Sequence, residues 1–404
     1  MTSPNQPAFV AWPALLAGVM ATLVGIGLAR FAYTPLIPVL VQANWFSATD
    51  AVYLGAANLL GYLIGALLAH RLTRWASARV VVGASLAAVV LSFVLCASPS
   101  TFYWFFSWRL MAGVAGAVLM VVVPSMVFSA TPQDKRPMVG TLVFSGIGLG
   151  ALLAATVIPL ILSHGLSATW WLLGALSLLA GCLCDVGLRR LSVRTDARPP
   201  TARSGEPGLQ SIAWLVVVLV VVAYALDGVG FIAHTVFWVD FLARENALGQ
   251  PAASLQWALF GAGAALGPFL MGLLVRQVGW HRALWMAFLM KAGAVALPLM
   301  SMAWLSQTVS SLVVGALTPG IVAIVSGRLA ELVGPHTHQK VWGRATAAFA
   351  LAQAVGGYSM AAIFAWTGSA SAIFAIGSTV LLVSAVLVWV SRVIEVSRSS
   401  DGRD

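Results

Sequence analysis

The sequence predicts an all-α membrane protein of twelve transmembrane helices in two pseudo-symmetric six-helix bundles, and three observations lead there. The 404 residues are 60% hydrophobic and only 8% charged, whereas soluble domains carry roughly a quarter charged residues. Apolar stretches long enough to cross about 30 Å of hydrocarbon recur along the chain. Residues of the first half also recur in the second half at a constant offset, which is typical of membrane proteins built from repeats.

Twelve apolar runs are long enough to span a bilayer, and they divide the chain into four parts. Backbone groups find no water inside lipid, so each run is predicted to be a helix. The runs cover residues 9–41, 48–69, 79–98, 101–129, 138–162, 168–188, 212–242, 252–275, 283–303, 308–330, 342–365 and 371–391. We expect an N-terminal bundle at 1–188, a flexible linker rich in Pro and Arg at 189–210, a C-terminal bundle at 211–391 and a tail at 392–404.

The first run of each half holds the features around which we expect the protein to be organised. Each contains a Gly-x-Gly pair, and 203 residues separate Gly25 and Gly27 from Gly228 and Gly230. Two prolines follow in the first run and predict a kinked helix whose freed carbonyls face a polar cavity. Small residues spaced four apart in runs two, five, eight and eleven predict helices that pack closely and slide. These pairs begin at Gly61, Gly146, Gly263 and Ala352.

The net charge of +10 is explained by membrane topology. With the N-terminus inside, eighteen of the 22 Lys and Arg residues fall at the cytoplasmic face, and only Arg244 lies in an outer loop. This asymmetry is the positive-inside rule, so both termini are expected in the cytoplasm, with anionic lipid headgroups beside the basic turns. The basic residues are scattered over six segments, which excludes a nucleic-acid patch. No obligate protein partner is predicted.

Missing motifs argue against several other classes of protein. The sequence has no Gly-rich phosphate loop followed by Lys-Ser/Thr, which argues against a nucleotide-driven pump. It has neither a metal-ligand cluster nor a nucleophile motif, so we expect no enzyme activity, no metal and no cofactor. The N-terminus lacks a basic region and a cleavage site, so the first run is expected to stay in the protein as a span.

Two local motifs point to a known family. Run four contains Arg109-x-x-Ala-Gly113-x-x-Gly116-Ala117, and run one contains GIGLARFAYTPLIPVL at residues 25–40. With the six-plus-six repeat and the basic turns, they resemble the major facilitator superfamily, in particular its bacterial YbfB/YjiJ-type subgroup. The resemblance implies a secondary transporter of the bacterial inner membrane, whose halves rock around a midplane site lined by runs one, four, seven and ten.

The few ionisable residues well inside the runs are the candidates for this site. An ionised side chain in mid-bilayer costs at least about 2.5 kcal/mol, so it faces a wet cavity or a partner. We expect Arg30 to bind a carboxylate through its guanidinium fork; alternatively, it satisfies carbonyls freed by Pro35. Arg109 is assigned to substrate binding, with snorkelling to the interface as the alternative. Lys291, on a peripheral run, is expected to reach the interface through its stem.

Asp227 and His234 are predicted to carry the coupling proton. They lie two helical turns apart in run seven, and a desolvated carboxylate or an imidazole can exchange a proton near neutral pH. The alternative is a permanent ion pair of Asp227 with Arg30 or Arg109, together with a His234 that bonds a carbonyl.

Tyr33 and Gln353 complete the predicted substrate site as hydrogen-bonding groups, although, like Asn58 and Gln256, they also suit bonds between helices. We therefore expect a proton-coupled transporter of a small organic solute, with Arg30 favouring an anion. Two alternatives stay open. One is an exporter of hydrophobic compounds that works by proton exchange, and the other is a non-transporting membrane sensor with the same fold.

Overall fold

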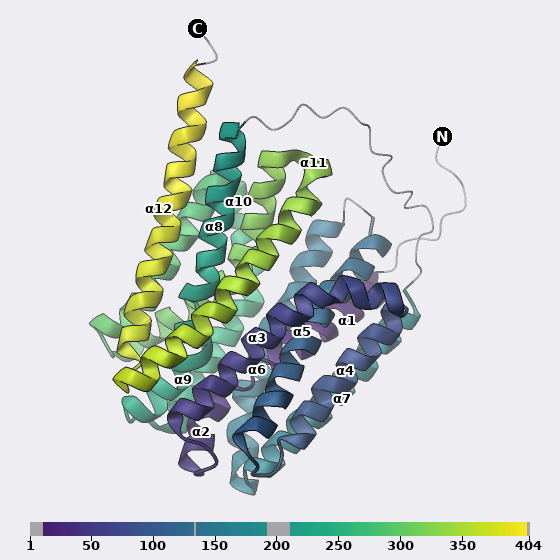
Figure 1. Cartoon of the computed structure of the whole chain (residues 1–404), viewed down its shortest axis with the longest axis vertical. Helices are drawn as coiled ribbons and strands as arrows, with labels where there is room; N and C mark the ends of the chain where they lie inside the picture. Colours follow the sequence, from purple (N-terminus) through teal and green to yellow (C-terminus); the bar gives the residue numbers. More distant parts are fainter. Residues whose placement is uncertain (1–10, 133–134, 192–210, 402–404) are drawn as a thin grey trace.

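The computed structural model describes residues 11–132, 135–191 and 211–401, and helices make up nearly all of them. The N-terminal half (purple to blue) lies beside the C-terminal half (teal to yellow) in Figure 1. Most of the predicted linker, from residue 192 to 210, lies outside the described residues. The α-helices are α1 (Ala11–Thr22), α2 (Ile37–Gln42), α3 (Ala48–Trp75), α4 (Ala78–Leu95), α5 (Phe102–Ala130), α6 (Arg136–Ile161), α7 (Leu166–Arg189), α8 (Ser211–Gly230), α9 (Trp238–Asp240), α10 (Gly249–Met300), α11 (Trp304–Thr367) and α12 (Ser371–Asp401).

The number of spans agrees with the predicted twelve. Among the described residues, eleven helical stretches are long and apolar enough to cross a membrane. One of them, Gly249–Met300, is 52 residues long and is broken at Gly279, where φ is 80°, so it supplies two spans. In α11 a similar break at Gly334, with φ of 71°, separates two further spans. Glycine suits both breaks because a Cβ disfavours positive φ.

The first span of each half departs from a regular α-helix. The sequence predicted a kink in the first of these spans only, from its two prolines. After α1 the chain forms a π-helix at Leu23–Leu28 and a 3₁₀ turn at Thr34–Leu36 before α2 begins. After α8 it forms π-helices at Ala233–Phe237 and Phe241–Glu245. Prolines lack the backbone N–H of a regular helix, and single π-helical turns are frequent at functional sites. Both breaks lie in the segments that carry most of the predicted site residues.

Close glycine contacts repeat between the two halves. A Cβ on Gly61 of α3 would lie 2.0 Å from the carbonyl oxygen of Leu110 in α5. A Cβ on Gly263 of α10 would lie 2.3 Å from the carbonyl oxygen of Leu312 in α11. Each residue of the second contact stands 202 positions after its counterpart. The sequence repeat is therefore also a repeat of backbone packing, in which small residues let helices approach closely.

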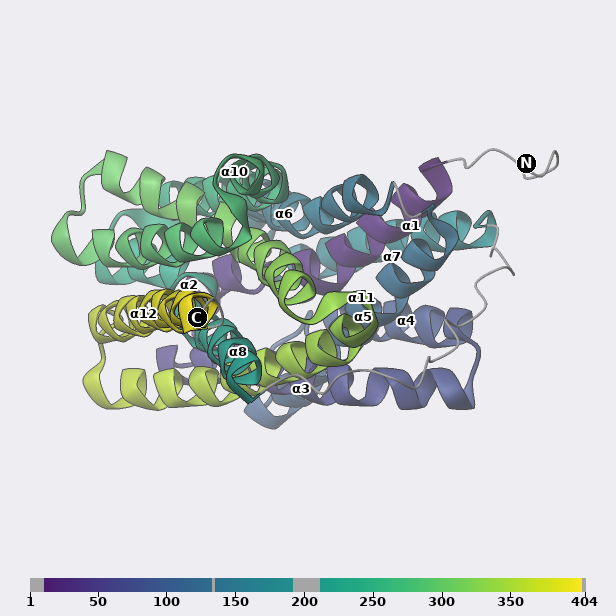
Figure 2. The same cartoon turned by 90° about the horizontal axis from the view of Figure 1, so that it is seen from above.

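Gly61 and Gly263 each pack within their own half, whereas other glycines lie where the two halves meet. Gly148 of α6 faces Gly261 of α10, and Gly357 of α11 faces Leu59 of α3. Seen from above, α6 lies beside α10 on one side of the molecule and α3 lies beside α11 on the other (Figure 2). Two helix pairs thus form most of the interface between the halves.

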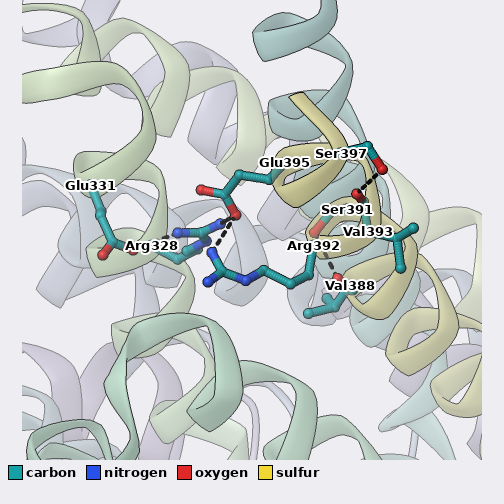
Figure 3. Close-up of polar contacts among 8 residues, drawn as sticks. All are labelled: Arg328, Glu331, Val388, Ser391, Arg392, Val393, Glu395 and Ser397. Atoms are coloured by element: carbon teal, nitrogen blue, oxygen red, sulfur yellow. Dashed lines mark hydrogen bonds and ion pairs between the residues drawn. The ribbon is translucent and has the colours of Figure 1, made fainter. Parts of the chain in front are cut away.

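Ion-pair clusters lie at the arginine-rich ends of the helices. In the C-terminal half, Arg328 of α11 bonds Glu331 and Glu395, each at 2.6 Å, and Arg392 of α12 also bonds Glu395 (Figure 3). In the N-terminal half one carboxylate joins α7 to α4, and the cluster comprises Asp185, Arg189 and Arg79. Asp185 and Arg189 lie one helical turn apart, a spacing at which opposite charges stabilise a helix.

Replacing Gly61 by alanine is expected to destabilise the protein by about 1–3 kcal/mol, because the added methyl group overpacks the contact with α5. Thermal unfolding of the detergent-purified protein measures the change. Gly83→Ala is the matched control, since Gly83 lies in a helix with nothing within 4 Å of its added Cβ. Equal melting temperatures for the two variants would contradict the close contact.

Candidate functional site

The break in the first span is held together by side chains from two other helices. The N–H of Tyr33 bonds the carbonyl of Arg30 rather than that of Ala29. The Ala29 carbonyl accepts hydrogen bonds from Arg109 Nη1 at 3.0 Å and from Asn58 Nδ2 at 3.3 Å. A backbone carbonyl inside a membrane must find a donor within the protein. Arg109 and Asn58 therefore satisfy the carbonyl that the irregular backbone exposes.

Arg109 lies in the interior of the N-terminal half. Its side chain is 2% exposed, and its guanidinium carbon lies 4.2 Å from the ring centroid of Tyr33. The alternative of snorkelling to the interface is therefore wrong for Arg109. Asn58 also donates to the Arg109 carbonyl at 3.2 Å, so it bonds helices to one another, as predicted. The Tyr33 hydroxyl donates to the Ala51 carbonyl at 2.9 Å.

Arg30 has weaker partners than Arg109. Its Nη2 is buried without a hydrogen-bond partner. The guanidinium carbon lies 5.5 Å from the ring centroid of Phe31 and 5.1 Å from that of Phe231, which belongs to the C-terminal half. Aromatic faces stabilise a desolvated cation by about 2 kcal/mol. This is less than the cost of at least about 2.5 kcal/mol of placing a charged side chain in mid-bilayer. Arg30 therefore has hydrogen-bonding capacity to spare, as does Arg109, whose Nε is also buried without a partner.

Arg30, Tyr33 and Arg109 come together around one small pocket between the halves, whose volume of about 10 Å³ is enough for a single water molecule. Asn58 and the hydroxyl residues Thr34 and Thr235 also line it. Among the described residues, no carboxylate forms an ion pair with either guanidinium. The pocket therefore carries two positive charges and several hydrogen-bonding groups, which is the chemistry that binds an anion.

Asp227 pairs with Lys291, which corrects two expectations. The alternative to proton coupling was an ion pair of Asp227 with Arg30 or Arg109, and Lys291 was expected at the membrane interface. Instead, Lys291 Nζ lies 2.7 Å from Asp227 Oδ1, and the side chains are 0% and 2% exposed. Lys291 lies near the middle of its span, where its stem is too far from water, and pairing with a carboxylate is the cheaper solution. The pair joins α8 to the second span of α10.

His234 and Gln353 also face the interior of the C-terminal half. His234 Nε2 lies 2.7 Å from the Ser310 hydroxyl, and its ring stacks on Trp238 with centroids 4.7 Å apart. The predicted alternative partner was a carbonyl, whereas the structure supplies a hydroxyl. Gln353 is fully buried and both its amide atoms lack partners. It lies outside the pocket of Arg30, beside Gly228 of α8.

The two faces of the protein differ in how the halves meet. On the side of α2, Thr34 donates to the Thr235 carbonyl at 2.5 Å and Gln250 donates to the Pro35 carbonyl at 2.9 Å. These bonds tie the first span to the C-terminal half. Toward the arginine-rich ends, a cavity of about 410 Å³ lies between α5, α6, α10 and α11. A smaller cavity of about 250 Å³ also lies at the face of α2, between the start of α3 and the end of α11. The halves are therefore joined by hydrogen bonds at that face, and the larger cavity between them lies at the other.

The sequence reasoning missed three residues that matter at this site. Lys291 was discounted because its span is peripheral, although its central position in that span was a signal. Phe231 carried no signal, since an aromatic residue in an apolar run is ordinary. Thr34 carried no signal either, because a threonine hydroxyl inside a span can bond a carbonyl of its own helix as readily as one of a neighbouring helix.

Comparison with known proteins shows similarity to transporters. Residues 22–389 match a family described as uncharacterised MFS-type transporter YbfB, where MFS is the major facilitator superfamily. The chain is 28% identical over 203 residues to an uncharacterized transporter, YgaY, of Escherichia coli O157:H7, covering 50% of each, so it spans about half the length of this relative. It is 25% identical over 295 residues to a gallate transporter of Pseudomonas putida, covering 66% of this chain and 65% of the relative. It is 24% identical over 354 residues to the class C tetracycline resistance protein of Escherichia coli, covering 80% and 87%.

Changing Asp227 to asparagine is expected to destabilise the protein by about 3–5 kcal/mol, because it leaves Lys291 buried and unpaired. The double variant Asp227→Leu with Lys291→Met removes both charges and is expected to recover most of this loss. Asp185→Asn is the matched control. Its pairs are 37–67% exposed, and we expect less than about 1 kcal/mol. Thermal unfolding that ranks Asp185→Asn as the worse variant would contradict the buried pair.

Proposed function

Because the chain belongs to the YbfB-type family of major facilitator superfamily transporters, we propose that it is a secondary transporter of a small organic anion, driven by protons. The observation that carries this proposal is the pocket in which Arg30 and Arg109 lie buried without a carboxylate. A substrate carboxylate would supply the missing negative charge. Arg30 would bind it with the unpartnered Nη2, while Arg109 holds the break in the first span.

An aromatic carboxylate fits the surroundings of Arg30 best. Phe31, next to Arg30, packs edge-on against Trp257 and Phe260, with centroids 5.8 and 5.7 Å apart. The indole N–H of Trp257 is buried without a partner and is a donor for a ring hydroxyl of the substrate. A relative from Pseudomonas putida carries the name gallate transporter. Gallate, an aromatic carboxylate with ring hydroxyls, is therefore the first substrate to test.

For proton coupling we propose Asp227 or His234, two titratable groups buried in the first span of the C-terminal half. We place the arginine-rich face and both termini in the cytoplasm of a bacterium, following the positive-inside rule. The hollow face between the halves then opens inward, and the bonds from Thr34 and Gln250 close the outer face. Rocking of the halves would exchange the two closures.

Export of a hydrophobic compound is the second candidate function. The cavity toward the arginine-rich face is lined by Phe128, Phe144, Met271, Trp280 and Trp342, among other residues. Such a wall suits an apolar solute better than a small anion. The relative with the longest match among those described is a tetracycline resistance protein. The direction of transport therefore has to be measured.

Arg30→Gln is expected to raise the KM for gallate uptake by roughly 10–100-fold, because a charge-assisted hydrogen bond contributes about 1.5–3 kcal/mol. Uptake of radiolabelled gallate into proteoliposomes measures the change. Arg190→Gln is the matched control, since Arg190 also lies over an aromatic ring, that of Trp12, 5.2 Å away, but is exposed. A wild-type KM in Arg30→Gln would overturn the anion site.

An imposed pH gradient distinguishes import from export. With the outside acidic, gallate is expected to accumulate in proteoliposomes several-fold above its outside concentration, and a protonophore should abolish the accumulation. Accumulation of gallate without an imposed pH gradient would contradict proton coupling. If the same pH gradient drives extrusion of a hydrophobic dye and no gallate flux, the protein is an exporter of hydrophobic compounds and not an importer of anions.

A further inference from the structure

Lys291 and Arg30 face the same aromatic ring from different halves of the protein. Lys291 Nζ lies 5.2 Å from the ring centroid of Phe231, and the guanidinium carbon of Arg30 lies 5.1 Å from it. The sum of these distances, 10.3 Å, is the largest separation that the two cations can have. The Phe231 side chain is 2% exposed, so water screens them poorly.

Helical backbone bonds on both sides of Phe231 fix the position of this ring. Phe231 is the first residue after α8, its N–H donates to the Asp227 carbonyl at 3.2 Å, and its carbonyl accepts from the Thr235 N–H at 3.1 Å. The ring also packs against Phe349 of α11, with centroids 5.9 Å apart. Phe231 is therefore a fixed apolar spacer between the anion pocket and the buried ion pair.

The net charge of the Asp227–Lys291 pair, on the far side of Phe231 from Arg30, depends on the protonation of Asp227. While Asp227 is ionised, its pair with Lys291 is neutral overall. A proton on Asp227 removes the negative charge and leaves Lys291 as an uncompensated cation. Because the pair is fully buried, this change is felt by other charges within about 10 Å.

The other titratable and charged groups around the pair are few. Tyr224 interacts electrostatically with Asp227, and His234 with Lys291. From the N-terminal half, Tyr62 acts on both Tyr224 and Arg30. The helices α11 and α12 also pack against α8. Their charged side chains among the described residues lie toward the arginine-rich ends of the spans: Arg328, Glu331, Lys340, Arg344, Arg392 and Glu395.

We propose that Asp227 is the proton site and that Lys291 transmits its protonation to Arg30 across the Phe231 ring, so that proton and anion bind cooperatively. The inference rests on the proposed function, since it requires an anion at Arg30. A net cation within 10.3 Å of Arg30 attracts that anion, and Coulomb's law at an interior dielectric constant of about 20 gives roughly a tenfold lower Kd.

Cooperative binding explains coupled transport without contact between proton and substrate. Coupling free energies are reciprocal, so an anion at Arg30 also favours the proton on Asp227. The protein then carries either both ligands or neither. The sign follows directly: anion binding is tightest at low pH, and it weakens as pH rises and Asp227 ionises.

Calorimetric binding of gallate to the purified full-length protein tests this coupling, between about pH 5.5 and 7.5, where the gallate carboxylate stays ionised. In the wild type we expect Kd to rise roughly tenfold over this range. Buffers of different ionisation enthalpy should reveal proton uptake on binding. Asp227→Asn removes the carboxylate that ionises, so its binding should lack the tenfold weakening with rising pH over the range in which Lys291 stays protonated.

The double variant Asp227→Leu with Lys291→Met guards against loss of folding, because it removes both buried charges. It should bind gallate weakly at every pH and take up no proton. Phe349→Leu alters an aromatic neighbour of Phe231 that contacts neither cation, and it should keep the wild-type pH dependence.

Three outcomes would overturn the inference. Wild-type protein that binds gallate through Arg30 without taking up a proton removes the coupling but leaves the anion site. Loss of proton uptake in His234→Gln, with uptake retained in the double variant, moves the proton site to His234. Wild-type protein that binds no gallate removes the proposed substrate class, and the cooperative step with it.

Discussion

The structure depends on one constraint, which is that a charged or polar group inside a membrane must find its partner within the protein. The broken first span exposes the Ala29 carbonyl, and Arg109 and Asn58 satisfy it. Lys291 satisfies Asp227. Arg30 is a buried cation that this constraint leaves without a hydrogen-bonding partner for its Nη2, and its contacts are aromatic rings. The proposed anion site follows from this unpartnered guanidinium.

The two halves share a scaffold but not a chemistry. Glycine contacts recur 202 residues apart, so the helices cross at the same places in both halves. The buried cations of the two sites do not recur: Ala233 stands 203 positions after Arg30, and Ala88 stands 203 positions before Lys291. A duplicated scaffold gives the symmetry needed to alternate between two open states. Unequal side chains then allow one half to hold the anion pocket and the other to hold the ion pair.

The broken first spans connect these two sites. Phe231 lies between the end of α8 and the first π-helix of the C-terminal half, and its ring faces both Arg30 and Lys291. Thr34, in the break of the N-terminal half, donates to the Thr235 carbonyl across the interface. In a regular α-helix the Thr235 carbonyl would accept a hydrogen bond from an N–H group of its own helix. The irregular backbone therefore supplies both the closure of one face and the short path between the two charged sites.

The sequence by itself determined the helical membrane fold, the twelve spans and the repeat, because length and hydropathy act locally along the chain. It also identified Arg30, Tyr33 and Arg109 as neighbours in one site, since the resemblance to a known fold placed runs one and four beside each other. Only the tertiary structure decided which charge meets which. Asp227 pairs with Lys291 and not with an arginine, because the rotation of α8 turns its carboxylate toward the second span of α10. Such a rotation is set by the packing of all neighbouring helices at once, and an apolar run carries no local pattern that reveals it.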